Sequence, residues 1–403
     1  MDLIRRNRDF RRVFGADLIS LAGDWFAVIP LLTLLPTLTG TGLWGGLVLA
    51  TDTAVFALLS PYAGTIADRF DRRRILIVSN LASVGSVLLL LLVRSEATAW
   101  IALVAVGGVA IAKAFYAPSS QAALPNLVDP EDLPVANVLA GSAWGTMLVI
   151  GASLGGVAAQ VLGTDVCFLL DAACLLIAAF LTWRVRRPFQ AANHGANHRG
   201  TVHAMAESLR FIRANPRIAA LVTVKSGVGL GNGSLTLFPL LASSVFMVGP
   251  LGAGLFYASR GLGSLLGPLL FRGQLQRPGR LLPGLALSMS VYGLAYVLFG
   301  FAPWFWLALL LCTIAHAAGG ANWVMSNFAL QAEVPDALRG RVFSVDFMLA
   351  TLAVACSQVV AGVLSDHVEL RVLASAGGVV TLVYALVWAT LTSRVRLADR
   401  VRE

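Results

Sequence analysis

Charged residues are scarce in this chain of 403 residues, at 13% of positions, whereas hydrophobic residues make up 57%. Soluble domains average about 25% charged residues, and even a domain of about 300 residues buries only roughly 75% of its unfolded surface. A water-soluble fold of this length could not bury so much apolar surface. The composition therefore excludes a soluble enzyme, a disordered protein and a disulfide scaffold, and it indicates an integral membrane protein.

The chain also lacks the sequence signatures of metal sites and of several enzyme classes. Its four cysteines lie in apolar runs without a CxxC pair or Cys/His ligand spacing, so we expect no disulfide, metal or cofactor. The phosphate-binding motif G-x-x-x-x-G-K-[ST] does not occur, which argues against ATP as the direct energy source. Neither G-x-S-x-G nor H-E-x-x-H occurs, which argues against a membrane-embedded acyltransferase or hydrolase.

Long apolar runs are what the chain has in abundance. A helix that crosses the hydrocarbon core needs about 20 residues, and runs bounded by charges or turn residues supply twelve candidates. We predict an all-α membrane protein with spans at 14–36, 43–66, 75–93, 99–121, 135–162, 165–184, 217–243, 252–271, 281–301, 303–328, 342–365 and 368–392.

The basic residues predict the orientation of these spans. If the N-terminus faces the cytoplasm, the tails and loops on that side hold most of the 30 lysines and arginines, and the outer side holds only Arg94 and Arg371. This asymmetry follows the positive-inside rule. We expect both termini of a multi-pass cell-membrane protein to be cytoplasmic, and we read the net charge of +9 as a topology signal rather than a nucleic-acid interface.

The chain is organised as two halves joined by one long polar stretch. We predict a six-helix bundle over 1–184, a cytoplasmic linker over 185–216 and a second six-helix bundle over 217–403. Within the linker, Val202, Met205, Leu209 and Ile212 have the spacing of an interfacial amphipathic helix. The loops ALPNLVDPEDL and ALQAEVPDAL occupy corresponding places in the two halves, which suggests parallel six-helix repeats related by pseudo-symmetry.

The stretch between the second and third spans, GTIADRFDRRR, carries a family resemblance. It is similar to the inner-loop signature of the major facilitator superfamily, G-x-x-x-D-R-x-G-R-R, with Asp71 in place of the second glycine. The matching residues are Gly64, Asp68, Arg69, Arg72 and Arg73. We expect Gly64 to let the second span end tightly and Asp68 to lie in the loop after it.

The resemblance implies a gate at the inner membrane face. In the superfamily, the carboxylate that corresponds to Asp68 sits against the start of the eleventh helix, here near Val342, and takes part in a charge relay with Arg72. A simpler interpretation remains open, in which Arg72, Arg73 and Arg74 only anchor the chain at the inner surface.

The fifth span and three other stretches extend the resemblance. Gly151, Gly155 and Gly156 resemble the G-P-x-x-G-G signature of the antiporter branch, with Ala152 in place of the proline, so close helix packing is expected. The segments SLAGDW, AP…ALP and VPDALRGRVF resemble the exporter branch that includes the enterobactin exporter and macrolide efflux proteins.

Six ionisable residues lie inside the predicted spans and are candidates for a substrate and proton cavity: Asp24, Asp52, Lys113, Lys225, Arg260 and His316. An intramembrane charge costs about 2.5–3.5 kcal/mol on insertion scales and usually marks a transport pathway. In the superfamily, spans 1, 4, 7 and 10 line the cavity, and each carries one of these groups. Pairs such as Asp24–Lys113 or Asp52–Arg260 could instead be structural ion pairs. We regard Asp17 as interfacial, and we do not expect Asp171 and Asp346 to face the cavity.

These features together predict a secondary active transporter that moves small amphipathic, drug-like or siderophore-like molecules by alternating access. We expect a monomeric, proton-coupled exporter in the lipid bilayer, with Asp24, and also Asp52 or His316, exchanging the proton. Three basic groups favour an anionic or zwitterionic cargo unless the aspartates neutralise them. An importer of the same fold, a membrane receptor that does not transport and a membrane-embedded enzyme remain as alternatives.

Overall fold

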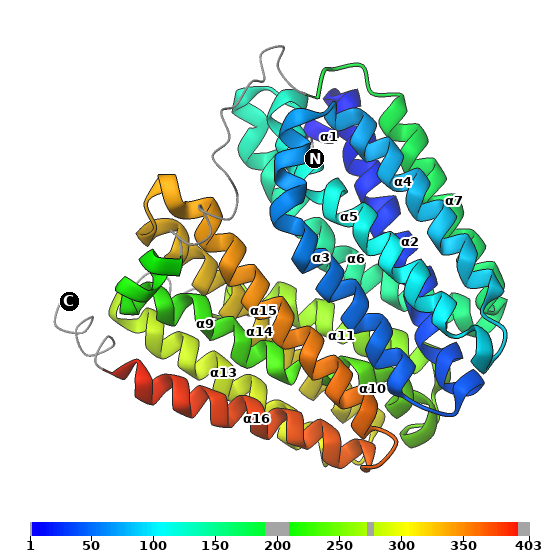
Figure 1. Ribbon diagram of the computed structural model, residues 1–403, viewed down its shortest axis with the longest axis vertical. Coiled ribbons are helices and arrows are strands. Elements are labelled where there is room, and N and C mark those ends of the chain that lie inside the picture. Colours follow the sequence, from blue (N-terminus) through cyan, green and yellow to red (C-terminus); the bar gives the residue numbers. More distant parts are fainter. Residues whose placement is uncertain (1, 190–208, 272–277, 394–403) are drawn as a thin grey trace. The chain divides into compact units, whose positions relative to one another are not determined.

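The computed structural model in Figure 1 describes residues 2–189, 209–271 and 278–393. Helices dominate these ranges, and no strand occurs among them. Of the four residues expected to form an amphipathic helix in the linker, Val202 and Met205 lie outside the described ranges. Leu209 and Ile212 belong to a short helical stretch over 209–214, where Ile212 is buried and Leu209 is exposed.

The first half of the chain forms a short helix and six long ones, which follow the predicted spans closely. They are α1 (Asp2–Arg6), α2 (Arg8–Thr39), α3 (Leu43–Arg69), α4 (Arg72–Leu89), α5 (Trp100–Leu127), α6 (Leu133–Leu162) and α7 (Thr164–Trp183). Local sequence sets the ends of α2. The Asn7 side chain accepts hydrogen bonds from the backbone N–H groups of Asp9 and Phe10, and Gly40 ends the helix with a φ of 68°.

The second half repeats this series with one interruption. Its helices are α9 (Pro216–Gly231), α10 (Ser234–Leu240), α11 (Gly249–Leu270), α13 (Pro278–Gly300), α14 (Phe305–Glu333), α15 (Asp336–Leu364) and α16 (Leu370–Leu391). The seventh span, expected as one helix, is divided into α9, α10 and a π-helical turn at Leu241–Val245. Gly233 lies at the first division, and Pro239 has no backbone N–H to donate within α10.

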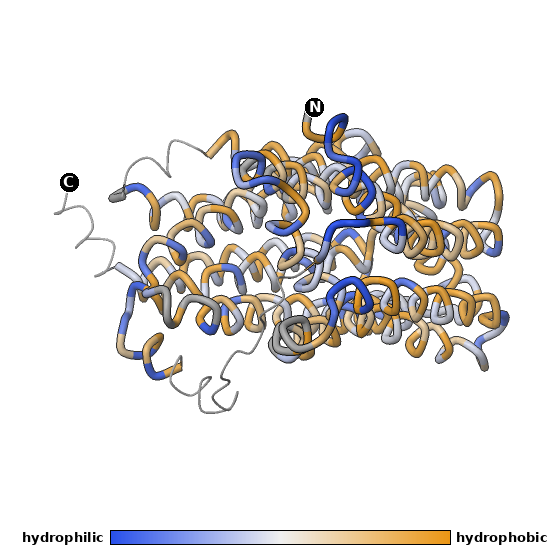
Figure 2. The backbone as a smooth tube through the Cα atoms, turned by 90° about the horizontal axis from the view of Figure 1, so that it is seen from above, coloured by the Kyte–Doolittle hydropathy of each residue, from blue (hydrophilic) through white to orange (hydrophobic). Residues whose placement is uncertain are grey.

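Ten of the described helices are long and apolar enough to cross a membrane. Figure 2 shows hydrophobic residues along most of the length of the helices, with a hydrophilic stretch near the N-terminus. The remaining two predicted spans correspond to α3, in which Leu43–Leu59 is an apolar helical stretch, and to α11, a helix of 22 residues that carries Arg260. Twelve helical segments therefore stand where twelve spans were predicted.

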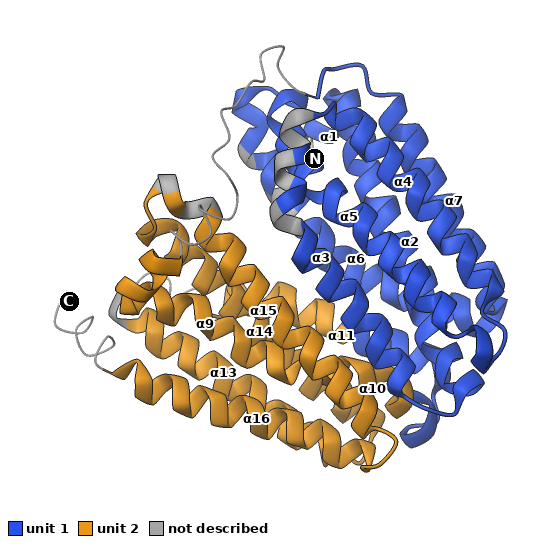
Figure 3. Cartoon of the chain, viewed as in Figure 1, with its two compact units in different colours: residues 1–197, 242–258 blue, residues 198–241, 259–403 orange. Residues whose placement is uncertain are grey.

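The chain forms two compact units, coloured separately in Figure 3. Unit 1 comprises residues 1–197 together with 242–258, and unit 2 comprises 198–241 together with 259–403. The first part of α11 thus belongs to unit 1, where Gly254 lies against Ala152 and Gly156 of α6.

The same order of neighbours recurs inside the two units. In unit 1, α2 packs against α6 and α7, and α4 packs against α5 and α7. In unit 2, the corresponding α9 packs against α15 and α16, and α13 packs against α14 and α16. This recurrence is the pseudo-symmetry expected from two parallel six-helix repeats.

One detail of the expected helix boundaries is wrong. Helix α3 does not end at Gly64 but continues through Asp68 to Arg69, with Phe70 as its C-cap. The turn is only two residues long because Asp71 already caps α4, its side chain accepting a hydrogen bond of 2.8 Å from the backbone N–H of Arg74. Asp71 thus supplies a helix cap at the position where the superfamily signature has glycine.

Candidate transport site

Unit 1 contains an ion pair between its first and fourth long helices. Asp24 lies in the middle of α2, and Lys113 lies in the middle of α5. The Lys113 Nζ is 2.8 Å from the Asp24 Oδ2, and the two side chains are 32% and 15% exposed, respectively. Apolar runs on both sides carry this pair into the bilayer core, where a lone charge would be costly. The pair is therefore only partly buried.

Two further carboxylates act on this pair. Asp52 on α3 interacts electrostatically with Lys113 and Asp24. Asp171 on α7, which was not among the six cavity candidates, also interacts with both. Its side chain is buried, and its Oδ1 has no hydrogen-bond partner among the described residues. Gly23 makes room for it, because a Cβ at that position would lie 2.7 Å from the Asp171 Oδ1. The cluster therefore contains three carboxylates and one lysine.

Unit 2 contains a second lysine–carboxylate pair of different character. Lys225 on α9 forms an ion pair with Asp346 on α15, and the two side chains are only 1% and 2% exposed. The Lys225 Nζ also donates a hydrogen bond of 2.6 Å to the Asn327 Oδ1 and lies 4.9 Å from the ring centre of Trp323. The ammonium group is thus stabilised by an ion pair, a hydrogen bond and a cation–π contact. Lys225 is thus enclosed by its own unit.

His316 lies on α14 in a group of aromatic side chains. Its Nε2 is 2.9 Å from the Tyr296 hydroxyl, and its ring meets those of Tyr292 and Tyr296 edge-on. The guanidinium of Arg260 acts electrostatically on the imidazole. Because His316 is only 4% exposed, its hydrogen bond to tyrosine fixes the ring within unit 2.

The pairing of both lysines changes the inference about cargo charge. Each ammonium group has an aspartate as its ion-pair partner, so neither offers an uncompensated positive charge to a ligand. The preference for an anionic cargo was based on three basic groups, and two of these are neutralised within their own units.

Two arginines of the inner-loop signature hold helix ends together inside unit 1. Arg72 is 6% exposed and donates a hydrogen bond of 2.8 Å to the carbonyl oxygen of Ala122 on α5. Arg73 donates to the carbonyl oxygen of Trp183 at the end of α7. Both arginines thus form hydrogen bonds to neighbouring helices, in addition to any anchoring at the membrane surface. Gly64, Asp68 and Arg69 lie in the last turns of α3, and their expected part in a gate stays a prediction.

The small residues of α6 lie where neighbouring helices come closest. A Cβ at Gly151 would lie 2.7 Å from the Trp25 Cδ1, and one at Gly155 would overlap the Trp25 carbonyl oxygen. A Cβ at Gly156 would lie 3.0 Å from the Cα of Gly254. Close approach of this kind is how membrane helices pack without a hydrophobic driving force. Gly151 and Gly155 thus allow α6 to approach α2 closely at Trp25, the residue next to Asp24.

Sequence reasoning did not find the interaction partners of three aspartates: Asp17, Asp171 and Asp346. Asp17 accepts hydrogen bonds from Tyr116 and from Ser120 on α5, and its expected interfacial position stays a prediction. Asp346 is the ion-pair partner of Lys225. The available signal was their position within apolar runs, but the sequence does not show which helix faces each one.

Apolar helices of spanning length, two repeated units and charge clusters within them define a multi-pass membrane transporter. The chain belongs to the Major Facilitator Superfamily, whose family profile matches residues 18–355. Relatives in this superfamily are transporters and not enzymes.

Among curated relatives, the chain is 22% identical to macrolide efflux protein A of Streptococcus pyogenes over 366 residues, covering 89% of this chain and 90% of the relative. It is 24% identical to the enterobactin exporter EntS of Shigella flexneri over 356 residues, covering 85% and 81%.

Solved structures of low sequence identity share the fold. A bacterial homologue of the human lysosomal transporter Spinster aligns over 98% of both chains with a TM-score of 0.74 and 17% identity. A POT family transporter crystallised with 5-aminolevulinic acid aligns over 96% of both chains with a TM-score of 0.77 and 11% identity.

Proposed function

We propose that this protein is a proton-coupled exporter of small amphipathic molecules that works by alternating access, with both termini in the cytoplasm. The observation that carries the proposal is the partly exposed Asp24–Lys113 pair together with the acidic residues around it. Similarity to a macrolide efflux protein and an enterobactin exporter supports the direction and the size class of the cargo.

The charge balance of the cluster supplies a reason for proton coupling. Lys113 can neutralise only one of the three carboxylates that act on it. Excess negative charge within the membrane is costly, so the cluster becomes neutral by taking up protons. A change in access that exposes Asp24 to the other side of the membrane then releases a proton there. The cluster thus has a protonated and a deprotonated state. If only the deprotonated state binds cargo, substrate and proton cross the membrane in opposite directions.

Reconstitution of the purified protein in vesicles with an internal pH-sensitive dye tests this proposal. A macrolide and enterobactin, the cargoes in the relatives' names, are suitable first substrates. We expect a pH gradient to drive substrate uphill in the parent protein. Asp24→Asn retains the shape of the side chain but cannot titrate, so it should lose uphill transport and still exchange substrate down its own gradient.

Asp165→Asn is the matched control, because Asp165 pairs with Arg94 in an exposed bridge away from the cluster. Uphill transport that survives Asp24→Asn undiminished would contradict coupling through this residue. Direction is read separately in inverted membrane vesicles: accumulation there indicates export, and accumulation only in right-side-out vesicles indicates an importer.

A further inference from the structure

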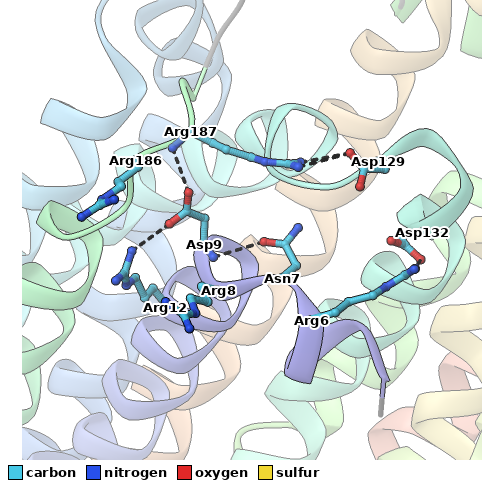
Figure 4. A pocket seen from close by; sticks show the side chains of 9 residues that line it. All are labelled: Arg6, Asn7, Arg8, Asp9, Arg12, Asp129, Asp132, Arg186 and Arg187. Atoms are coloured by element: carbon cyan, nitrogen blue, oxygen red, sulfur yellow. Dashed lines mark hydrogen bonds and ion pairs between the residues drawn. The ribbon is translucent and has the colours of Figure 1, made fainter.

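A pocket with many arginines opens at one end of unit 1, away from the charge cluster. Its volume is about 480 Å³, and it lies where the start of α2, the turn after α5 and the segment after α7 meet. Figure 4 shows the side chains that line it: Arg6, Asn7, Arg8, Asp9, Arg12, Asp129, Asp132, Arg186 and Arg187. Nothing in the proposed transport cycle uses these residues.

Each carboxylate of the pocket already has a guanidinium partner. Asp132 pairs with Arg6. Asp129 accepts from the Nη1 and Nη2 atoms of Arg187, at 3.2 and 3.3 Å.

Asp9, at the centre, uses both of its oxygens. Its Oδ1 accepts a hydrogen bond of 2.9 Å from the Arg12 Nη1, and its Oδ2 accepts one of 3.0 Å from the backbone N–H of Arg187 (Figure 4). The aspartates thus hold three of the five arginines in place.

The other two arginines, Arg8 and Arg186, remain available. Both side chains are exposed, and neither forms an ion pair within the described ranges of the chain. Arg8 is also the first residue of α2, so the positive end of that helix dipole adds to the charge at the pocket. The lining therefore has two positive charges without a carboxylate partner among the described residues, in a concave site whose other three arginines are paired with aspartates.

We propose that this pocket binds the phosphate group of an anionic headgroup, with Arg8 and Arg186 as its ligands. Guanidinium groups bind phosphate oxygens with two parallel hydrogen bonds, and this geometry favours arginine over lysine at such sites. The pocket is near the inner leaflet if the termini are cytoplasmic as proposed, and anionic lipids attract basic residues at that surface. A soluble phosphate compound shares the same chemistry, so the test must distinguish the two sources.

Titration of the purified, delipidated full-length protein in detergent can test this site. The probes are dioctanoyl phosphatidylglycerol, dioctanoyl phosphatidylcholine and inorganic phosphate, with binding measured by native mass spectrometry and by thermophoresis. We expect phosphatidylglycerol to bind the parent, and we expect Arg8→Ala/Arg186→Ala to weaken this binding about tenfold. The double variant Arg210→Ala/Arg280→Ala, which removes two exposed arginines elsewhere in the chain, should bind like the parent.

The outcomes separate the possibilities. If the parent and the control variant bind inorganic phosphate and the pocket variant Arg8→Ala/Arg186→Ala does not, the site is supported and its ligand is a soluble phosphate compound. If the parent binds the anionic lipid but not inorganic phosphate, the site is supported and its ligand is a membrane lipid. Equal losses in the two double variants, equal binding of phosphatidylcholine, or unchanged binding in the pocket variant would overturn the proposal. Because binding is measured without a gradient or cargo, failure here leaves the transport proposal untouched. An unaltered melting temperature shows that the pocket variant is folded.

Discussion

Lys225 and Asp346 form an ion pair that unit 2 closes off almost completely, since only 1% and 2% of the two side chains are exposed. The corresponding pair in unit 1, Lys113 with Asp24, leaves 32% and 15% exposed. A buried pair whose partners are both enclosed holds helices in place, whereas we expect the partly exposed pair to be accessible to protons and to cargo. The two lysines of this chain therefore lie in different environments, and we expect them to have different roles.

Removal of the Lys225 charge should destabilise unit 2 strongly. Lys225→Met leaves the Asp346 carboxylate buried without its cation, a change that costs about 3–5 kcal/mol in other proteins. We expect a lower melting temperature in detergent, and recovery of most of the loss in Lys225→Met/Asp346→Leu, which removes both charges. Lys113→Met is the comparison, because its partner Asp24 is partly exposed and should tolerate the loss better. Equal destabilisation by the two single variants would contradict this distinction.

Amine labelling should also distinguish the two lysines. They are the only lysines in the sequence, so labelled peptides from purified protein report on each side chain with little background. We expect Lys113 to react with a small amine reagent and added substrate to slow this reaction. Lys225 should react only after denaturation, because Asp346, Asn327 and Trp323 surround its ammonium group. Rapid labelling of Lys225 in the folded protein would show that the enclosure opens readily.

The packing of α6 against α2 should be sensitive to one added methyl group. The Cβ introduced by Gly155→Ala would overlap the Trp25 carbonyl oxygen. Backbone atoms cannot rotate away as side chains do, so the helices must separate. Overpacking of this kind costs about 1–3 kcal/mol, and we expect a lower melting temperature and weaker transport. The matched control is Gly85→Ala on α4, where a Cβ would meet nothing within 4 Å. Its stability should equal or exceed that of the parent.

The turn between α3 and α4 gives a prediction about a residue that departs from the family signature. Asp71 caps α4 through its hydrogen bond with the Arg74 N–H. Asp71→Ala should cost about 1 kcal/mol, and Asp71→Asn, which can still cap, should cost little. Thermal unfolding of the three proteins decides the matter. A gain in stability from Asp71→Ala would show that this cap does not stabilise the helix.

Much of this architecture follows from the sequence because a membrane permits few solutions. Backbone groups in the hydrocarbon core must be satisfied within their own segment, so a long apolar run has to become a helix. For this reason the predicted spans and the observed helices agree to within a few residues at most boundaries. The interruption near Gly233 and the continuation of α3 past Gly64 were missed, since glycine permits a break without requiring one.

The sequence by itself determined that charges on different helices had to be accommodated inside a membrane, and it identified Asp24, Lys113 and Lys225 among them. It did not determine their partners. Whether a carboxylate meets a lysine depends on the rotation of each helix about its axis, which is fixed by contacts between residues far apart in the chain, such as Gly23 with Asp171 or Gly155 with Trp25. Only the tertiary structure therefore decided that Lys225 is enclosed with Asp346, and that Lys113 remains partly open beside Asp24.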